Sequence, residues 1–326
     1  MDKGRPRRFE FFCLLIVVAI GFGCRTSVQQ REPPQPAWDV DRAEIVHWRA
    51  SDPSFEQDFA LEASGLAASG GRLYVSSEKY ARILVIEQTA DARARVIRLD
   101  VPRHSELEGV ALIGKTLFLS DEAHAAVYEV DLGDETDGAE ADTREPLAAK
   151  MLPFDDLDVR GGKIGFEGIE VGPDDDRMYV LLERSGSEST GCVSKIYRLR
   201  RAGDRLVADL DALEVALEDC AWRLTGLAWW KGRLIALRTQ FPGERYEVVA
   251  VDLVNGEAEV VLELTEFLRS LAQQGWSNNV EGIAVAGDGS LWLVADNAVT
   301  GVIDAPLPPP SDDDTLLLRI PPTAHD

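Results

Sequence analysis

The stretch that decides the fold is Val280-Glu281-Gly282-Ile283-Ala284, which is followed by the apolar run 290–296, Ser-Leu-Trp-Leu-Val-Ala-Asp. The first strand begins at a Glu-Gly step, the chain turns at Asp288-Gly289, and the second strand ends in a carboxylate. Short apolar runs bounded by turn residues are typical of β-strands rather than helices. A third apolar run at 315–320 follows, so this region is predicted to form a small antiparallel sheet.

The same pattern recurs along the chain, with its glycines at positions 65, 109, 168, 226 and 282 and spacings of 44, 59, 58 and 56 residues. The three strands of the four earlier copies lie at 62–67, 72–78 and 83–87; 107–111, 116–122 and 126–131; 166–170, 177–183 and 195–199; and 224–228, 233–238 and 247–252. Periods of this length are typical of propeller blades. We therefore predict an all-β protein, a β-propeller of five four-stranded blades, with six blades as the alternative.

Fourth strands are visible after several copies, at 94–99, 205–208 and 258–262. The fifth copy has none, so we expect the segment Ala43–Trp48 to supply it and to close the ring without free sheet edges. Residues 41–322 are predicted to form this single domain. A helical period at Leu264, Phe267, Leu268 and Leu271 predicts one short helix between copies four and five, with Thr265 as its N-cap.

The N-terminal residues read as an export signal. Four basic residues precede the apolar run 11–20, which is too short to span a membrane. The sequence Gly21-Phe22-Gly23-Cys24 resembles the bacterial lipobox, although Gly21 stands where Leu is usual. We predict a signal peptide at 1–24, lipidation of Cys24, a Pro/Gln-rich tether at 25–40, and a lipid-anchored protein in the bacterial periplasm or outer envelope. An ordinary cleaved signal or an uncleaved anchor is the alternative.

Two cysteines, Cys192 and Cys220, lie outside the signal region. An exported protein folds in an oxidising compartment, where two such cysteines often pair. A disulfide between them is therefore predicted, and two separate buried thiols are the alternative.

The composition is strongly acidic, with 34 basic and 57 acidic residues and a net charge of -23. Such a chain repels nucleic acid and anionic lipid, so neither is an expected partner except for membrane contact through a lipid anchor. The acidity fits either solubility or cation binding. A monomer is expected.

At its repeats the chain resembles the esterase-like, phytase-like β-propeller family and the related SdiA-regulated family of exported bacterial proteins. The resemblance rests on the Glu-Gly steps and on the closing run 279–297. It implies phosphoester or ester hydrolysis and, in related lactonase-like propellers, a calcium ion at the channel mouth. Copy four departs from the pattern, because Thr225 replaces the Glu and Arg238 replaces the second-strand carboxylate.

Propeller topology predicts that two sets of repeated carboxylates share one face, because the end of each second strand lies beside the start of the first. The expected metal ligands are Glu108, Glu167 and Glu281 at first-strand starts, and Asp121, Glu183 and Asp296 at second-strand ends, with Glu78 beside them. Hard oxygen ligands suit Ca²⁺, and four His residues in the whole chain make a His-bound metal unexpected. The alternative is that these carboxylates accept backbone hydrogen bonds between blades.

The same face is expected to carry four cationic side chains for an anionic or ester substrate: Lys79, Arg184, Arg223 and Arg238. These cations could instead balance the carboxylates. His104 and His124 are the candidate general bases on the rim, and ordinary surface roles are the alternative.

Three functions remain open from the sequence. The first is a calcium-assisted hydrolase of phosphoesters, esters or lactones. The second is a non-catalytic ligand-binding or scaffolding propeller at the cell envelope, and the third is a calcium-stabilised interaction module. The fold alone does not choose between them.

Overall fold

The structure is a computed structural model that describes residues 37–50, 62–89, 92–133, 145–155, 165–174, 177–241, 243–277, 279–296 and 315–323. The chain divides into a unit that ends at Gln35 and a second unit, Pro36–Asp326. The predicted signal peptide, the lipidation site Cys24 and the tether up to residue 36 lie outside the described residues. Within the described ranges, no helix has the length and apolar character needed to cross a membrane.

The first two repeat copies form antiparallel sheets in chain order. The strands are β3 (Ala63–Ser69), β4 (Arg72–Ser77), β5 (Arg82–Glu87) and β6 (Ala92–Asp100), then β7 (Leu107–Ile113), β8 (Thr116–Asp121), β9 (Ala126–Asp131) and β10 (Leu147–Leu152). The outer strands β6 and β10 pair in parallel and so join the two sheets. A short strand, β2 (Trp48–Ala50), also pairs in parallel with β6.

Copies three and four follow the same order. Their strands are β12 (Phe166–Val171), β13 (Arg177–Ser187), β14 (Gly191–Ala202) and β15 (Arg205–Ala216), then β16 (Trp222–Trp230), β17 (Arg233–Gln240), β18 (Arg245–Val251) and β19 (Ala258–Glu263). The two-residue strand β11 (Phe154–Asp155) adds in parallel to the outer edge of β15.

The last sheet joins the two ends of the unit. It contains β20 (Asn279–Val285), β21 (Leu291–Asp296), β22 (Leu317–Ile320) and, as its fourth strand, β1 (Glu44–Ile45). The N-terminal strand therefore closes this sheet, as expected, but it is shorter than the predicted segment Ala43–Trp48. Trp48 instead begins β2 on the neighbouring sheet, because the chain crosses between the two sheets at this point.

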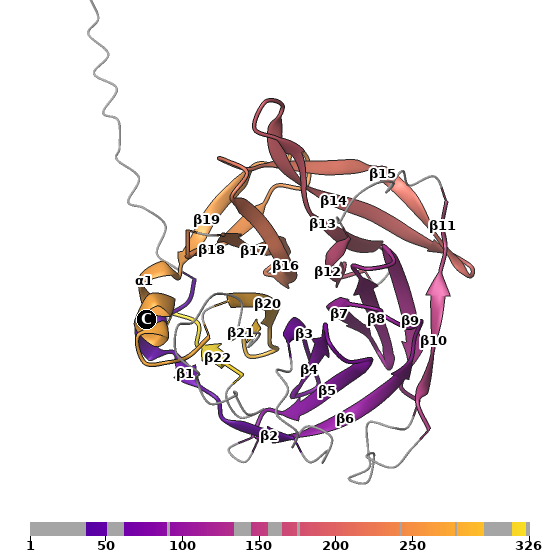
Figure 1. Cartoon of the computed structure of the whole chain (residues 1–326), viewed down its shortest axis with the longest axis horizontal. Coiled ribbons are helices and arrows are strands. Elements are labelled where there is room, and N and C mark those ends of the chain that lie inside the picture. Colours follow the sequence, from indigo (N-terminus) through magenta and orange to yellow (C-terminus); the bar gives the residue numbers. More distant parts are fainter. Residues whose placement is uncertain are drawn as a thin grey trace, which may run out of the picture. The chain divides into compact units, whose positions relative to one another are not determined.

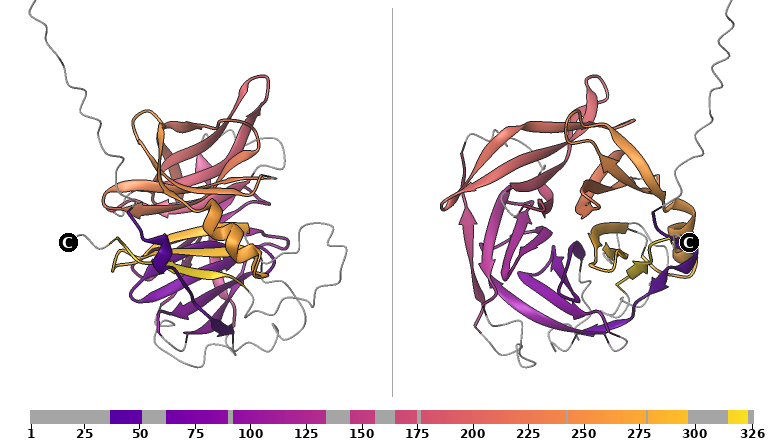
Figure 2. Two further views of the ribbon diagram at one scale, coloured as in Figure 1. Left: turned by 90° about the vertical axis from the view of Figure 1, so that its left-hand side faces the viewer. Right: turned by 180° about the vertical axis from the view of Figure 1, so that it is seen from behind.

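The innermost strands of the sheets contact one another in a closed series, β3 to β7, β12, β16, β20 and back to β3. Figure 1 shows them around the centre, with outer strands such as β6, β10, β15 and β19 at the periphery. Figure 2 shows the sheets from the side and from behind. The predicted fold class, an all-β propeller, is confirmed. The number of blades stays a prediction, because several connecting segments lie outside the described residues.

The apolar core lies between consecutive sheets. One cluster packs Leu84 of the first sheet against Trp292 of the last. Similar clusters lie between the sheets of every other neighbouring pair. The cluster between the fourth and last sheets also receives helix α1 (Thr265–Ala272), which follows the predicted periodicity. Leu264 rather than Thr265 is its N-cap.

The segment just before the first strand also belongs to the folded unit. Trp38, which the sequence analysis assigned to the tether, is wholly buried in the core between the fourth and last sheets. Its indole Nε1 donates a hydrogen bond to the Gly289 carbonyl oxygen at 2.9 Å. A short 3₁₀ helix at Val40–Arg42 leads from it to β1.

Candidate functional site

Each inner strand contains a β-bulge at the same point of the repeat. The pairing of first and second strands shifts register between Ala63 and Leu66, and equivalent shifts occur in the other copies before Val110, Gly168, Gly226 and Gly282. A bulge re-aims the side chain of the extra residue. The residues at these bulges are those before the repeated glycines: Ser64, Glu108, Glu167, Thr225 and Glu281.

The repeated glycines bring the inner strands into close backbone contact at the axis. A Cβ added to Gly109 would lie 2.5 Å from the Ile169 nitrogen, and one added to Gly226 would lie 2.8 Å from the Glu281 carbonyl oxygen. All five glycines line one small axial space, together with Glu167 and Thr225. That space has a volume of about 10 Å³, which is at most the room of one water molecule. A substrate therefore has to bind above this level.

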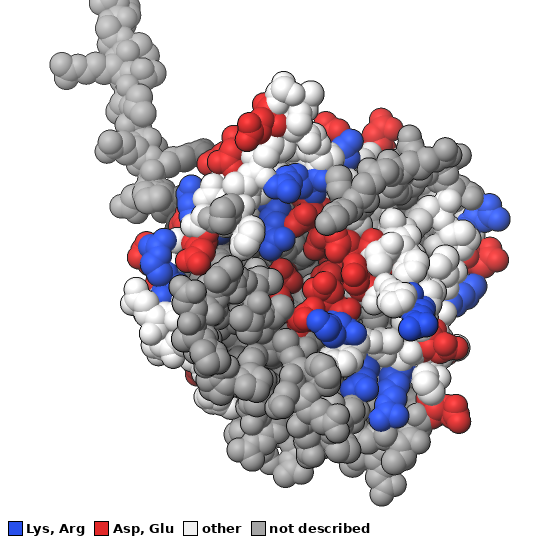
Figure 3. All heavy atoms as spheres, viewed as in Figure 1, with Lys and Arg blue, Asp and Glu red and all other residues white. Residues whose placement is uncertain are grey.

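Two further positions of the repeat lie on the same face as the bulges. One is the residue two places before each bulge residue. The other is its partner at or just after the end of the second strand, as in the pairs Asn279 with Asp296 and Arg223 with Thr239. We call these positions and the bulge residues together the mouth. The mouth comprises Glu62, Ser64, Glu78, Glu106, Glu108, Glu122, Gly165, Glu167, Glu183, Arg223, Thr225, Thr239, Asn279, Glu281 and Asp296. Figure 3 shows acidic side chains gathered at the centre of this view.

Arg223 is the central cation of the mouth. Its Nη1 donates to Glu183 Oε1 at 2.7 Å, its Nη2 donates to Glu281 Oε1 at 3.3 Å, and its Nε donates to Thr239 Oγ1 at 3.2 Å. Burial lowers the pKa of Arg223, but attraction to Glu183 and Glu281 outweighs burial and raises it overall. Arg223 therefore stays charged and links copies three, four and five.

The carboxyl groups of the mouth are poorly solvated. Burial, followed by repulsion from Glu167 and Glu281, raises the pKa of Glu108 well above its ordinary value. Burial and then repulsion from Glu183 do the same to the pKa of Glu167. A group of raised pKa either holds a proton near neutral pH or needs a cation beside it.

Two carboxyl groups of the mouth have pKa values near neutrality. Burial raises the pKa of Glu281 to about 8, although Arg223 lowers it and Asn279 donates a hydrogen bond to it at 3.0 Å. Burial, then repulsion from Glu62 and Asp296, raises the pKa of Glu78 to about 7. Both groups can therefore exchange a proton with a substrate at physiological pH.

Two hydroxyl groups complete the innermost level. Ser64 donates a hydrogen bond to Glu108. Thr225 is 4% exposed, and its Oγ1 has no hydrogen-bond partner among the described residues. Buried hydroxyls are normally paired, so the Thr225 hydroxyl is available to a ligand in the axial space that it lines.

The predicted carboxylates separate into two groups. Glu108, Glu167, Glu183, Glu281 and Asp296 all lie in the mouth, but Asp121 does not. Asp121 is wholly buried, and it accepts hydrogen bonds from the Tyr128 hydroxyl at 3.1 Å and from the backbone N–H of Glu106 at 3.2 Å. Successive side chains of a strand point to opposite sides, so Glu122, the next residue, takes the place expected for Asp121.

The four predicted substrate-binding cations are already paired within the protein. Lys79 lies 2.7 Å from Glu62, and Arg184 donates to the Cys220 carbonyl oxygen. Arg238 is not in the mouth, because its Nε donates to the buried carboxylate of Glu247 at 2.8 Å and its guanidinium lies 4.8 Å from the Trp222 ring centre. Arg223 is therefore the candidate that lies deepest in the site.

The two predicted histidines lie on exposed turns. His104 has a positive φ of 66°. His124 Nδ1 lies 2.9 Å from Asp121 Oδ2, so Asp121 orients the imidazole ring. His124 follows Glu122 of the mouth by two residues.

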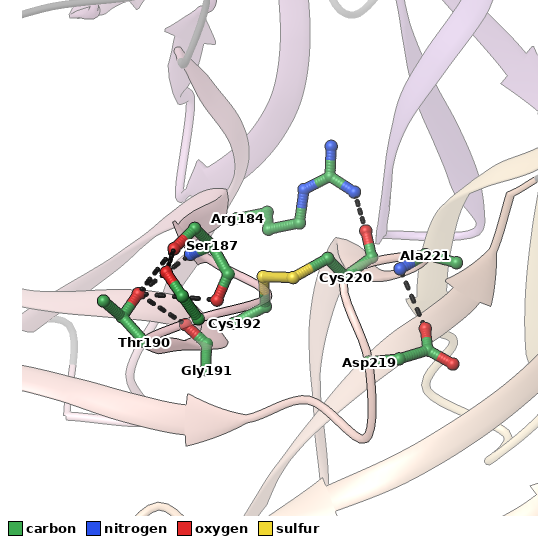
Figure 4. Close-up of a disulfide and its surroundings, with 9 residues drawn as sticks. Arg184, Ser187, Thr190, Gly191, Cys192, Asp219, Cys220 and Ala221 are labelled. Carbon is green, nitrogen blue, oxygen red and sulfur yellow. Dashed lines mark hydrogen bonds between the residues drawn. A yellow bond between two sulfur atoms is a disulfide. The ribbon is translucent and has the colours of Figure 1, made fainter.

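A disulfide connects the two sheets that contribute Glu183 and Arg223. Cys192 on β14 and Cys220, three residues before Arg223, are bonded, with their Cα atoms 5.3 Å apart (Figure 4). The loop before β16 is also fixed by Asp219, whose carboxylate accepts from the Ala221 N–H at 2.8 Å. The disulfide thus fixes the segment that leads into Arg223.

Among the described residues, no group of three or more His, Cys, Asp or Glu side chains is placed closely enough to hold a metal ion. The donor atoms nevertheless suit Ca²⁺ in kind, since they are desolvated carboxylate oxygens and an unpaired hydroxyl, that of Thr225. Binding of Ca²⁺ would require the flexible Glu side chains to rotate toward one another.

The sequence matches the family described as "Phytase-like: Esterase-like activity of phytase" over residues 35–298. The chain belongs to this phytase-like family. The match includes the inner strands of all five repeat copies and therefore the whole mouth. No curated protein matches the chain.

Solved structures similar to this phytase-like protein are β-propellers. Glutaminyl cyclase of Myxococcus xanthus has a TM-score of 0.52 and 16% identity, covering 87% of this chain and 97% of that one. The PQQ-bound aldose sugar dehydrogenase of Streptomyces coelicolor has a TM-score of 0.46 and 14% identity, covering 87% and 100%. At 16% identity, the likeness to the glutaminyl cyclase shows the fold alone.

Sequence reasoning missed Glu122, Glu106 and Asn279 as members of the mouth. An alignment of Val75-Ser76-Ser77-Glu78 with Leu119-Ser120-Asp121-Glu122 would have identified Glu122. Glu106 and Asn279 lie two residues before the Glu-Gly step, a position that the repeat pattern does not mark.

Proposed function

We propose that this phytase-like propeller is a hydrolase of esters, lactones or phosphoesters and that its mouth is the active site. The observation that carries the proposal is the convergence of repeated, desolvated carboxyl groups around Arg223 and the unpaired Thr225 hydroxyl. Proton donors and a fixed cation in a poorly solvated site are what hydrolysis of such bonds requires.

In this proposal Glu281 transfers the proton. With a pKa of about 8 it is mostly protonated at neutral pH, so it can donate the proton to a departing alcohol and recover it from water. Glu78, whose pKa is raised to about 7, is the second group with a suitable proton affinity.

Arg223 stabilises the oxygen that becomes negative during attack, and Thr225 can hold one water in the axial space below it. Both belong to copy four, the sector in which Thr225 and Thr239 replace the repeated carboxylates. Arg223 is held in place by Glu183, Glu281 and Thr239, and a donor fixed before the reaction stabilises developing charge without reorganisation.

Calcium is part of the proposal. Glu108 and Glu167 would hold the ion in their ionised form, with Glu183 and Asp296 at the next level of the mouth, whereas Glu281 keeps its proton for transfer. A bound Ca²⁺ would supply polarisation of the oxygen under attack and orientation of water.

His124 is a second candidate base, because Asp121 orients its ring at 2.9 Å. No comparable contact supports His104 among the described residues. An exported, lipid-anchored protein remains part of the proposal through Cys24 and the preceding apolar run.

The test is a panel of aryl esters, lactones and p-nitrophenyl phosphate, assayed with Ca²⁺ and with chelator. Turnover that is lost with chelator supports the calcium-assisted hydrolase, and turnover that survives chelation supports hydrolysis without the ion. No turnover of any substrate would contradict the proposal and favour the ligand-binding or scaffolding function.

Thermal unfolding tests calcium binding independently of turnover. Because an ion that binds only the folded state stabilises it by about 2.7 kcal/mol at 100 times its Kd, Ca²⁺ should raise the Tm of the wild type. The increase should be smaller in Glu108→Gln and Glu167→Gln. A wild-type Tm that chelator leaves unchanged would exclude calcium from the site.

A further inference from the structure

We propose that the substrate of this mouth carries a positively charged group, such as an amine or a quaternary ammonium, next to a neutral ester or lactone bond. This inference rests on the proposed hydrolase function and narrows its substrate class. It predicts that polyanions that carry phosphate groups are poor substrates.

The cations that a phosphate group would need are already engaged. Phosphate recognition relies on charge-assisted hydrogen bonds from Arg or Lys. Lys79 is paired with Glu62, and the three Arg residues expected at the site are bound to protein oxygens. Their positive charges are thus partly balanced by protein oxygens, which weakens their attraction for a phosphate group.

Carboxyl groups far outnumber cations in the mouth. Among the described residues, four of the repeat copies contribute nine carboxyl groups, and the cations in or next to the mouth are Arg223, Lys79 and Arg184. With protons on Glu108, Glu167 and Glu281, six carboxyl groups still remain. Figure 3 shows acidic side chains gathered there. One bound Ca²⁺ would leave the excess of acid in place. A field of this sign attracts a cationic ligand and repels a polyanion.

The copy-four sector supplies the second, independent observation. Its Thr225 hydroxyl is 4% exposed, lines the axial space and has no partner in the described part of the chain. It can hold one water there. Among the described residues, the hydrogen bonds to Thr239, Glu183 and Glu281 occupy three of the five N–H donors of Arg223, and the remaining donors suit the carbonyl oxygen of an ester or lactone. The mouth therefore has one carboxylate-free side for the reacting carbonyl and acidic sides for a cationic group.

The experiment compares matched p-nitrophenyl esters whose acyl chains end in a trimethylammonium, a methyl or a carboxylate group, with p-nitrophenyl phosphate as the fourth substrate. We expect kcat/KM for the trimethylammonium ester to exceed that of the methyl ester by about tenfold at low ionic strength. Salt at 0.5 M should reduce this preference, and the carboxylate and phosphate substrates should be slowest.

Two variants test whether the preference for the trimethylammonium ester comes from the carboxylates of the mouth. Glu122→Gln removes one carboxylate of the mouth and should lower the ratio of kcat/KM between the trimethylammonium and methyl esters. Glu266→Gln removes a carboxylate of helix α1 whose side chain is 86% exposed and lies outside the mouth, and it should leave that ratio unchanged.

Equal or faster hydrolysis of the carboxylate or phosphate substrate would overturn the proposal. Absence of turnover for every ester would contradict the hydrolase function instead. In that case, calorimetry with the non-hydrolysable amides of the same acyl chains decides the charge preference. Tighter binding of the trimethylammonium amide than of the carboxylate amide supports the proposed charge preference, and equal or weaker binding overturns it.

Discussion

At the scale of the residue, the mouth depends on carboxyl groups that are largely buried in the protein. Glu281 has a side chain that is 14% exposed, and burial raises its pKa from an ordinary value near 4.5 to about 8. Such a group binds a proton more tightly in the folded protein than in the unfolded chain. The folded state is therefore favoured at low pH and loses this advantage as the pH rises through 8.

This linkage predicts that the free energy of unfolding in chelator falls as the pH rises from about 4.5 to 8. Glu281→Gln removes the titrating group, so its unfolding free energy should be less pH-dependent and higher than that of the wild type at pH 8. We expect a gain of at least about 1 kcal/mol, since one pKa unit corresponds to about 1.4 kcal/mol. Urea unfolding between pH 5 and 8.5 measures this. A wild type that becomes more stable over that range would contradict it.

The identity of the residues at the mouth was only partly accessible from sequence. The Glu-Gly steps place Glu108, Glu167 and Glu281 correctly, because a repeated residue beside a repeated glycine has the same position in every copy. Whether Asp121 or Glu122 points into the mouth depends on the strand register, because neighbouring residues of a strand point to opposite sides. The pairing of Arg238 with Glu247 depends on a neighbouring strand that sequence spacing does not specify.

At the scale of the element, the β-bulges and glycines set how closely the inner strands approach. Gly109→Ala should destabilise the protein by about 1–3 kcal/mol or more, because its Cβ would lie 2.5 Å from a backbone nitrogen. Gly287→Ala is the matched control, since a Cβ there meets no atom within 4 Å. Equal melting temperatures for the two variants would contradict the close packing at the axis.

The disulfide supports the loop that leads to Arg223. In the chain-entropy model, a link between residues separated by 28 positions stabilises by about 3–4 kcal/mol. The Cys192→Ser/Cys220→Ser double variant should lose that amount in unfolding free energy, and reductant should not lower it further. A wild type whose stability is unchanged after both thiols are shown to be reduced would exclude this contribution.

Strands and helix α1 could be anticipated because their apolar periods are regular. The parallel strands β2 and β11 could not, since each is two or three residues long and is defined by its partner rather than by its own sequence.

At the scale of the whole molecule, the N-terminal segment and the last repeat copy complete one sheet. β1 pairs with β22, and Trp38 fills the core beside Trp230, with ring centres 4.9 Å apart. Repetition predicts such a closure because a ring without it would leave an open sheet edge. The closed ring holds β3, β7, β12, β16 and β20 at one axis, and this is what brings distant carboxyl groups into one mouth.

The most direct test of this account is the turnover number for an alkyl ester, whose alcohol needs a proton to depart, in the wild type and in Glu281→Gln, with Glu266→Gln as the folded control. We predict that Glu281→Gln lowers kcat by about 100-fold or more, as expected for loss of a proton-transfer group, while Glu266→Gln matches the wild type. A Glu281→Gln protein that folds and retains wild-type kcat would contradict the assignment of the active site to the mouth.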